Sequence, residues 1–233
     1  MRIHIKFQTQ TFPLKYRMMI VSLIKEALQL SSKEYFHKIY ASNNKKRPFS
    51  FGVYLHDYEI QADVFQVNGY VGVTVASPDP EFMLYFYNGI MSMDEFQYKT
   101  FHMSRMKVQM VHTQPVTGSV VKMKTLSPLL IQNKQAKPVL VDEPSFEKEL
   151  NYISDMILRE IRGIGLKQPL RFMNKNMKKV VVKENIHSGN ETLFFTAYQG
   201  IFLLNGHPED LEFLSEAGLG FRSSQGFGAV EVI

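Results

Sequence analysis

The sequence contains no cysteine in its 233 residues. This absence excludes disulfides, thiolate nucleophiles, cysteine-ligated zinc and iron–sulfur clusters, whichever compartment the protein occupies. Long apolar runs are also missing. The longest, Met18 to Ile24, is interrupted by Ser22, so we expect no transmembrane helix. The first residues alternate like a β-strand and do not resemble a signal peptide, so we expect a cytoplasmic protein with no membrane partner.

The composition is that of a globular protein with a mild basic excess. Hydrophobic residues make up 45% of the chain and charged residues 21%, which is incompatible with disorder along the whole chain. Lys and Arg number 27 against 22 Asp and Glu, giving a formal charge of +5. That charge is compatible with a polyanionic partner but is weak evidence for one. The length fits one large domain or two small ones.

The first half predicts the element order β-α-β-β-α-β. Ile3, Ile5 and Phe7 alternate with polar residues and indicate a first strand with one buried face. Pro13 is a favoured first helical residue, and apolar spacing then predicts a helix over 13–30. The pair Ser31 and Glu34 has capping-box spacing and predicts a second, short helix. The later elements are a strand at 49–55, an Asn68-Gly69 hairpin turn, a helix at 80–90 and strand sequence at 96–112.

The second half repeats this order without a visible sequence repeat. Residues 113–118 read as a linker, and the elements after it are a strand from 120, a helix from Pro144, strands near 179–186 and 192–205, a helix at 208–216 and a last strand at 227–233. The sequence therefore predicts an α+β fold of two tandem ferredoxin-like (RRM-like) βαββαβ domains, 1–113 and 119–233.

The most unusual segment is rich in glycine. Two Gly-apolar-Gly units enclose five residues, and the segment reads Gly218, Leu219, Gly220, Phe221, Arg222, Ser223, Ser224, Gln225, Gly226, Phe227, Gly228. Glycine allows positive φ and close approach of a ligand to the backbone, and exposed N–H groups of such a loop can bind phosphate. The alternative is a tight helix-to-strand connection that needs glycine for steric reasons only.

Several nucleotide and metal motifs are absent. The glycine-rich segment follows no strand and precedes no helix, so it is not a dinucleotide fingerprint, and no Gly-Lys-Ser/Thr follows it as in a P-loop. No histidine–carboxylate cluster has ligand spacing; His207 to Asp210 comes nearest and reads as a helix start. We therefore expect no metal and no cofactor.

The Gly-apolar-Gly pairs just before a C-terminal strand resemble the signature of the CRISPR repeat-RNA processing endoribonucleases, the sixth family of CRISPR-associated proteins. Thr125-Leu126-Ser127-Pro128 resembles that family as well, and so does a histidine followed by a basic loop and a Phe-Ser-Phe strand at 49–51. The resemblance covers the whole chain. It implies tandem ferredoxin-like domains and metal-independent cleavage of CRISPR repeat RNA into guide RNAs that carry a 5′ repeat-derived tag.

The same resemblance implies a catalytic set. RNA supplies its own nucleophile, the 2′-hydroxyl, so an enzyme needs a proton-transfer group and a cation. His37 lies where the family has its general acid/base histidine, although the residue taken alone would read as an ordinary surface histidine. Lys46 or Arg47 matches the assisting basic residue, and the sequence does not separate them. Several relatives have a tyrosine in the first helix, where this chain has Lys25; Tyr40 or Tyr16 are possible substitutes.

Candidate RNA-binding residues lie in three segments. They are Lys45 of the basic loop, Gly218, Gly220, Arg222, Ser223, Ser224, Gln225, Gly226 and Gly228 of the glycine-rich segment, and Lys167, Arg171, Lys178 and Lys179 of the basic stretch at 163–183. The basic stretch has two readings: a surface that follows phosphates, or an exposed loop and edge strand in which lysine discourages pairing.

Two other functions remain open from the sequence. The chain could be a non-catalytic subunit that holds repeat RNA in a CRISPR effector complex with other subunits. A generic tandem RNA-recognition protein is a further alternative, but its Lys/Arg-Gly-Phe/Tyr pattern is absent. The expected partner is CRISPR repeat RNA, and the expected state is a monomer or homodimer.

Overall fold

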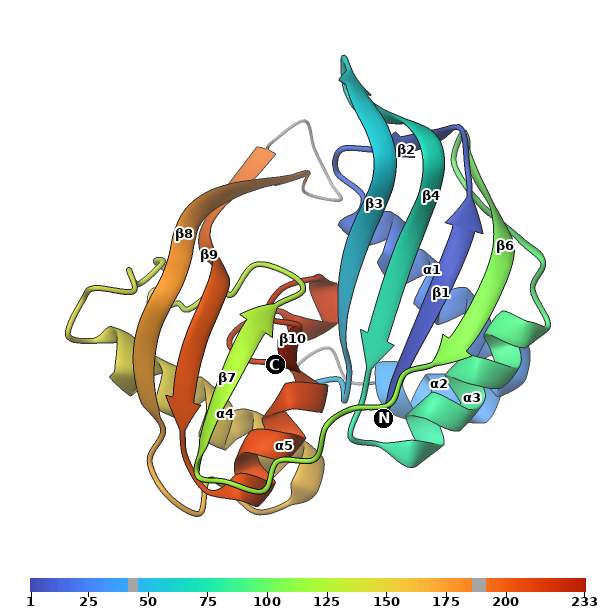
Figure 1. The fold of residues 1–233 in the computed structure, drawn as a ribbon. Coiled ribbons are helices and arrows are strands. Elements are labelled where there is room, and N and C mark those ends of the chain that lie inside the picture. Colours follow the sequence, from blue (N-terminus) through green and yellow to red (C-terminus); the bar gives the residue numbers. More distant parts are fainter. Residues whose placement is uncertain (42–45, 186–191) are drawn as a thin grey trace. The chain divides into compact units, whose positions relative to one another are not determined.

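The computed structural model describes residues 1–41, 46–185 and 192–233 (Figure 1). Contacts divide it into two compact units, one of residues 1–45 and 52–112 and the other of residues 46–51 and 113–233. Each unit is described by itself. Among the described residues, no helix combines the length and the apolar character needed to cross a membrane.

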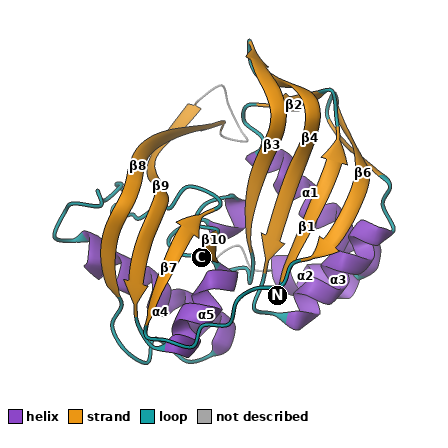
Figure 2. Cartoon of the chain, viewed as in Figure 1, coloured by secondary structure: helices purple, strands orange, loops and turns teal. Residues whose placement is uncertain are grey.

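The first unit is a sheet with helices on one face (Figure 2). Its elements are β1 (Arg2–Gln8), β2 (Thr11–Pro13), α1 (Arg17–Ser31), α2 (Lys33–Tyr40), β3 (Ser50–Gln61), β4 (Val64–Ala76), α3 (Pro80–Met91), β5 (Glu95–Tyr98) and β6 (Phe101–Met110). The sheet order is β2-β4-β1-β6-β5, with β3 also paired to β4. The strands β3-β4-β1-β6 thus form the antiparallel ferredoxin-like sheet, to which β2 and β5 are short additions.

The predicted alternation of β1 is confirmed. Ile3, Ile5 and Phe7 are at most 2% exposed, because β1 is a central strand between β4 and β6 and its apolar face lies under the helices. Lys6 lies on the opposite face, while Arg2 at the start of the strand is also buried.

The second unit repeats the topology. Its elements are β7 (Val120–Thr125), α4 (Phe146–Arg162), β8 (Arg171–Asn185), β9 (Thr192–Asn205), α5 (Pro208–Ala217), a 3₁₀ turn (Ser223–Gln225) and β10 (Val230–Val232). The antiparallel order is β10-β7-β9-β8. Both units are therefore βαββαβ folds, as the sequence predicted. The predicted linker is not free of structure, because Val116 is buried in this unit's core.

Helix α4 forms as its apolar spacing predicts. Phe146, Leu150, Ile153 and Ile157 are all at most 3% exposed, because they recur on one stripe that faces the sheet. The helix ends at Gly163, whose φ of +85° gives the left-handed cap.

Two predicted boundaries of the first unit are wrong. Pro13 does not start a helix: it ends β2, which pairs with β4 from Thr11 to Pro13, and α1 begins only at Arg17. The cap of α2 is Ser32 and not Ser31, since the Ser32 hydroxyl accepts the Tyr35 N–H at 3.1 Å. Both shifts arise from pairing and cap geometry that propensity does not encode.

The predicted Asn68-Gly69 turn is also wrong. Strand β4 runs straight through both residues, and the β3–β4 turn lies at 62–63, with Ala62 at φ +49°. A Cβ at Gly69 would lie 2.3 Å from the His56 carbonyl oxygen. This glycine therefore permits close strand approach and does not make a turn.

Boundaries differ in the second unit as well. Helix α4 begins at Phe146 and not at Pro144, β8 begins at Arg171 and not near 179, and β10 is limited to Val230–Val232. The polar and basic residues at the start of β8 concealed the strand, because β8 is an edge strand and these positions face solvent.

Candidate nucleic-acid interface and catalytic residues

His37 is exposed on the short helix α2. The helix is fixed by Tyr35, which is 2% exposed and donates its hydroxyl to Asp79 Oδ2 at 2.7 Å. Burial and the Asp79 carboxylate both raise the pKa of Tyr35. The imidazole of His37 meets the edge of the Phe36 ring, with centroids 5.6 Å apart. His37 is thus accessible on an anchored helix, a suitable position for proton transfer to a bound substrate.

Tyr40 and Lys25 lie together beside the same helix. The rings of Phe36 and Tyr40 stack at 4.8 Å, and Lys25 Nζ of α1 lies 5.0 Å from the Tyr40 ring centroid. Tyr16, the other candidate, stacks on Phe12 at the opposite end of α1, nine residues or about 14 Å along the axis from Lys25. Of the two tyrosines, Tyr40 is the one grouped with Lys25 and α2.

The segment 46–51 packs with the second unit. The Lys46 backbone N–H donates to Glu160 Oε2 at 2.6 Å, and Lys46 Nζ lies 5.5 Å from the Phe221 ring centroid. The Ser50 hydroxyl donates to the Glu216 carbonyl at 3.1 Å, while Phe49 and Phe51 are fully buried. The basic and Phe-Ser-Phe motifs are therefore held against α4, α5 and the glycine-rich loop.

Lys46 has an altered ionisation. Burial lowers the pKa of its amine, and the Arg222 charge lowers that pKa further, while the Glu160 carboxylate opposes them. Arg47 is half-buried and its carbonyl accepts the Phe49 N–H at 2.8 Å. Lys46 is thus placed at the glycine-rich loop, beside Phe221 and Arg222. Lys45 lies outside the described residues.

The four loop glycines have a steric role. Gly218, Gly220, Gly226 and Gly228 all have φ between +63° and +91°. A Cβ would lie 2.5 Å from the Leu130 carbonyl at Gly220, and 1.7 Å from the Leu219 carbonyl at Gly228. These positions therefore exclude any side chain.

Most of the glycine N–H groups are already used inside the protein. Gly218 donates to Leu214, Gly226 to Ser223 and Gly228 to Pro128. These three N–H groups have backbone partners in turns of the loop, which favours the steric reading, while RNA binding by the loop stays a prediction. The steric alternative accounts for the glycines.

Polar side chains of the loop, unlike the three glycine N–H groups that have backbone partners, are accessible for binding a ligand. Arg222, itself at φ +61°, is exposed, donates to Gln225 Oε1 at 2.9 Å and lies 4.7 Å from the Phe195 ring centroid of β9. Ser224 and Gln225 are half-exposed, whereas Ser223 is buried. Arg222 and its neighbour Gln225 are held in a defined geometry that an anion can meet.

The Thr125–Pro128 motif forms hydrogen bonds with the C-terminal end of the glycine-rich loop. Gly228 donates to the Pro128 carbonyl, Ala229 donates to Ser127 Oγ at 2.9 Å, and Thr125 Oγ1 accepts the Gly200 N–H at 2.9 Å. Three motifs distant in the sequence, 46–51, 125–128 and 218–228, thus form one hydrogen-bonded region of the second unit.

The basic stretch divides into two parts. Lys167 pairs with Glu209, and Arg171 Nη1 pairs with Glu147 at 3.2 Å, so each has an acidic partner. Lys178 and Lys179 lie on the edge strand β8, are exposed, and have no ion pair in the part of the chain that the structure describes. Phosphate binding by the stretch 163–183 stays a prediction, and Lys178 and Lys179 are the candidates in it that have no ion pair among the described residues.

Sequence similarity identifies the family of the chain. Residues 111–232 match the family model described as CRISPR associated protein Cas6, C-terminal. The chain belongs to the Cas6 family. No curated protein matches the sequence.

Solved structures show the same fold as this Cas6-family chain. A RAMP protein binding different RNA substrates has a TM-score of 0.83 at 17% identity, covering 100% of this chain and 99% of that one. A Cas6-related protein from Pyrococcus furiosus has a TM-score of 0.83 at 18% identity, covering 100% and 98%. A Cas6 product complex has a TM-score of 0.70 at 14% identity, covering 100% and 99%. The tandem ferredoxin-like prediction is confirmed.

Sequence reasoning missed a basic and aromatic face of the N-terminal sheet. Lys6 Nζ lies 4.1 Å from the Tyr70 ring centroid, and the His56 ring stacks on Tyr70 at 5.0 Å with a 5° interplanar angle. Tyr54 lies beside them, 6.5 Å from Tyr70. The available signal was the alternation of Tyr54 and His56 on β3, which places both on one face. A cation and stacked rings are the elements of a single-strand binding surface.

His4 is a further titratable group on this face. Its Nδ1 lies 2.9 Å from Thr74 Oγ1. Burial chiefly, and the nearby Lys6 charge secondarily, lower the pKa of His4. The hydrogen bond to Thr74 favours a structural role for His4. Within the described ranges, no three histidine or acidic side chains gather into a group that could hold a metal ion.

Proposed function

We propose that this Cas6-family protein is an endoribonuclease that cleaves CRISPR repeat RNA in precursor transcripts without a metal ion. The match of residues 111–232 to the Cas6 model carries the proposal. Cas6 product and substrate-mimic complexes among the structural relatives support RNA as the ligand class. The exposed His37 and the Lys46–Arg222 pair supply the two kinds of group that the chemistry needs.

The proposed reaction is an internal transfer. The 2′-oxygen forms a bond to the adjacent phosphorus while the bond from phosphorus to the 5′-oxygen breaks. The 2′-hydroxyl loses a proton, and the leaving 5′-oxygen gains one. The products are a 2′,3′-cyclic phosphate and a 5′-hydroxyl.

Each proposed residue has one role. His37 exchanges protons as general acid, general base or both. Lys46 supplies positive charge to the transition state. Tyr40 holds the α2 cluster together with Phe36 and Lys25. Arg222, Gln225 and the β8 lysines Lys178 and Lys179 bind RNA phosphates, which provides affinity but not sequence choice.

Replacing His37 tests the assignment. His37→Ala is expected to slow single-turnover cleavage of repeat RNA by about 10²–10⁴-fold, the usual contribution of a positioned acid or base. RNA affinity is expected to change little, because affinity comes from many cations. The measurement is a gel assay with enzyme in excess, paired with a binding titration.

His112→Ala is the matched control, since His112 is also exposed in the N-terminal unit. Cleavage by His37→Ala at the parental rate would refute the catalytic role. Tight binding of repeat RNA by the parent protein without any cleavage would instead favour the non-catalytic RNA-binding subunit.

A further inference from the structure

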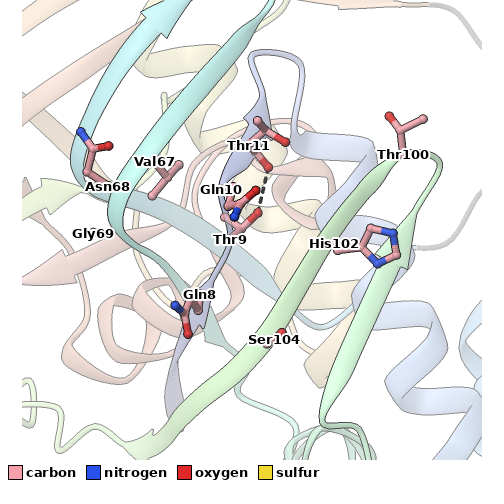
Figure 3. Close-up of a pocket in the computed structure, with 10 residues that line it drawn as sticks. All are labelled: Gln8, Thr9, Gln10, Thr11, Val67, Asn68, Gly69, Thr100, His102 and Ser104. Atoms are coloured by element: carbon pink, nitrogen blue, oxygen red, sulfur yellow. Dashed lines mark hydrogen bonds between the residues drawn. The ribbon is translucent and has the colours of Figure 1, made fainter.

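The N-terminal unit contains a polar hollow that the proposed reaction does not use. It has a volume of about 510 Å³ and is lined by Gln8, Thr9, Gln10, Thr11, Val67, Asn68, Gly69, Thr100, His102 and Ser104 (Figure 3). These residues come from the end of β1, the β1–β2 turn, the start of β2, the middle of β4, the β5–β6 turn and the start of β6. The volume falls in the range of small-ligand sites, about 300–1,000 Å³.

The polar side chains of the hollow are available to a ligand. Thr9 is occupied, since its hydroxyl donates to the Thr11 carbonyl at 2.8 Å. In the described part of the chain, the side chains of six other lining residues make no hydrogen bond: Gln8, Gln10, Asn68, Thr100, His102 and Ser104. Three amides, two hydroxyls and an imidazole therefore provide unused donors and acceptors.

Among the residues that the structure describes, no lysine, arginine, aspartate or glutamate lines the hollow. A phosphate would find no lysine or arginine there, and a cationic ligand would find no carboxylate. The ligand that matches is neutral, with several hydrogen-bonding edges. A nucleobase has this chemistry, because its edges carry carbonyl, ring-nitrogen and amino groups and no formal charge.

The hollow adjoins the basic and aromatic face. Gln8 lies two residues after Lys6 on β1, so both side chains project from the same side of the sheet, and Gln8 pairs in register with Ser104. Asn68 lies two residues before Tyr70 on β4, so these two side chains also project from one side of the sheet. A register shift in the β1–β6 pairing occurs at Lys6 and Phe7, beside the hollow; such bulges are common next to functional sites. A single RNA strand whose phosphate is bound by Lys6 and whose base stacks on Tyr70 would place its next base in the hollow.

We propose that this hollow is a base-reading subsite that receives one unpaired adenine of the bound RNA. Amide side chains favour adenine, because Asn and Gln can bind its N6 amino group and N7 together, and three amides line the hollow. The inference rests on the proposed function only in taking RNA as the ligand. It assigns base choice to residues of β1, the β1–β2 turn and β4, apart from the catalytic set.

Short RNA homopolymers test the subsite without requiring knowledge of which nucleotide of the repeat occupies it. The intact protein is expected to bind hexaadenylate more tightly than hexauridylate in a fluorescence anisotropy titration. Gln8→Ala or Gln10→Ala is expected to weaken hexaadenylate binding by about 5- to 150-fold, the value of a good bidentate amide–adenine contact, with hexauridylate changed less than about twofold. Both variants are expected to fold, because the Gln10 carbonyl that accepts the Val67 N–H at 2.9 Å remains.

The control is Gln29→Ala, an exposed glutamine on α1, which is expected to leave both affinities unchanged. Three results would overturn the inference: no preference of the parent protein for adenylate, parental affinities in both variants, or equal losses for both RNAs. Competition by adenosine monophosphate at concentrations near those of the hexamer would also overturn it, by indicating a mononucleotide site. None of these titrations requires cleavage, so their failure is distinct from failure of the nuclease proposal.

Discussion

At the residue scale, Lys46 is held between opposite charges. Glu160 accepts its backbone N–H and raises the pKa of its amine, whereas burial and Arg222 lower that pKa. The amine must be protonated to stabilise negative charge, so these neighbours set the upper pH limit of its contribution. The effects of Glu160 and Arg222 on this pKa can be measured separately by replacing one residue at a time.

Glu160→Gln and Arg222→Gln are expected to shift the pKa of the Lys46 amine in opposite directions. Glutamine at 160 keeps an oxygen for the Lys46 N–H but removes the negative charge, so the pKa of Lys46 falls further. Glutamine at 222 removes a like charge, so the pKa rises. The measurement is the pH dependence of Lys46 acylation, read by mass spectrometry, because only the neutral amine reacts.

The same variants change the rate profile in a defined way. If Lys46 acts as a cation, the high-pH limb of the cleavage profile shifts to lower pH in Glu160→Gln. Glu149→Gln, elsewhere on α4, serves as the control. Identical labelling midpoints in all four proteins would show that the neighbours do not act on Lys46.

The candidate functional residues could be predicted from the sequence only in part. His37 was a candidate through the family resemblance, since one exposed histidine on a capped helix has no distinguishing pattern of its own. The position of Lys46 could not be predicted, because it depends on contacts with Glu160 and Phe221, more than a hundred residues away. The Tyr70 and His56 stack was missed because it joins two strands.

At the element scale, different residues of the glycine-rich loop maintain its backbone conformation and face solvent, where RNA could bind. Gly220 is fixed by φ +78° and by the Leu130 carbonyl that a Cβ would strike, whereas Arg222 is exposed. The structure therefore favours the steric reading of this glycine over a direct contact with RNA.

Gly220→Ala is expected to lower the free energy of unfolding by about 1–3 kcal/mol, the cost of a strained backbone position. Arg222→Gln is expected to change stability by no more than about 0.5 kcal/mol but to weaken RNA binding. Denaturant titration and anisotropy measure the two effects. A stable Gly220→Ala protein with a selective binding defect would restore a direct glycine–RNA contact.

Element boundaries show where local signals fail. The order of strands and helices was predictable because apolar periodicity is local, as in β1 and α4. The Asn68-Gly69 pair was misread, because a glycine that admits a neighbouring strand looks the same in sequence as a glycine that makes a turn. The edge strand β8 was shortened for a related reason, since its exposed lysines resemble a loop.

At the scale of the whole molecule, the tandem ferredoxin-like architecture follows from element order, and residues 111–232 carry the Cas6 family match. The assignment of segment 46–51 to the second unit could not be predicted, because it depends on contacts of Ser50 and Lys46 with α5 and α4. That packing explains why the basic and Phe-Ser-Phe motifs accompany the glycine-rich loop.

Cleavage of repeat RNA in excess chelator tests the central claim most directly. The substrate is a precursor transcript with a CRISPR repeat of the source genome, in one version all-ribose and in another with a 2′-deoxy nucleotide before the cut. The account predicts full cleavage of the first and none of the second, because the 2′-oxygen is the nucleophile. Loss of cleavage in chelator with recovery on adding a divalent ion, or cutting of the 2′-deoxy substrate, would contradict it.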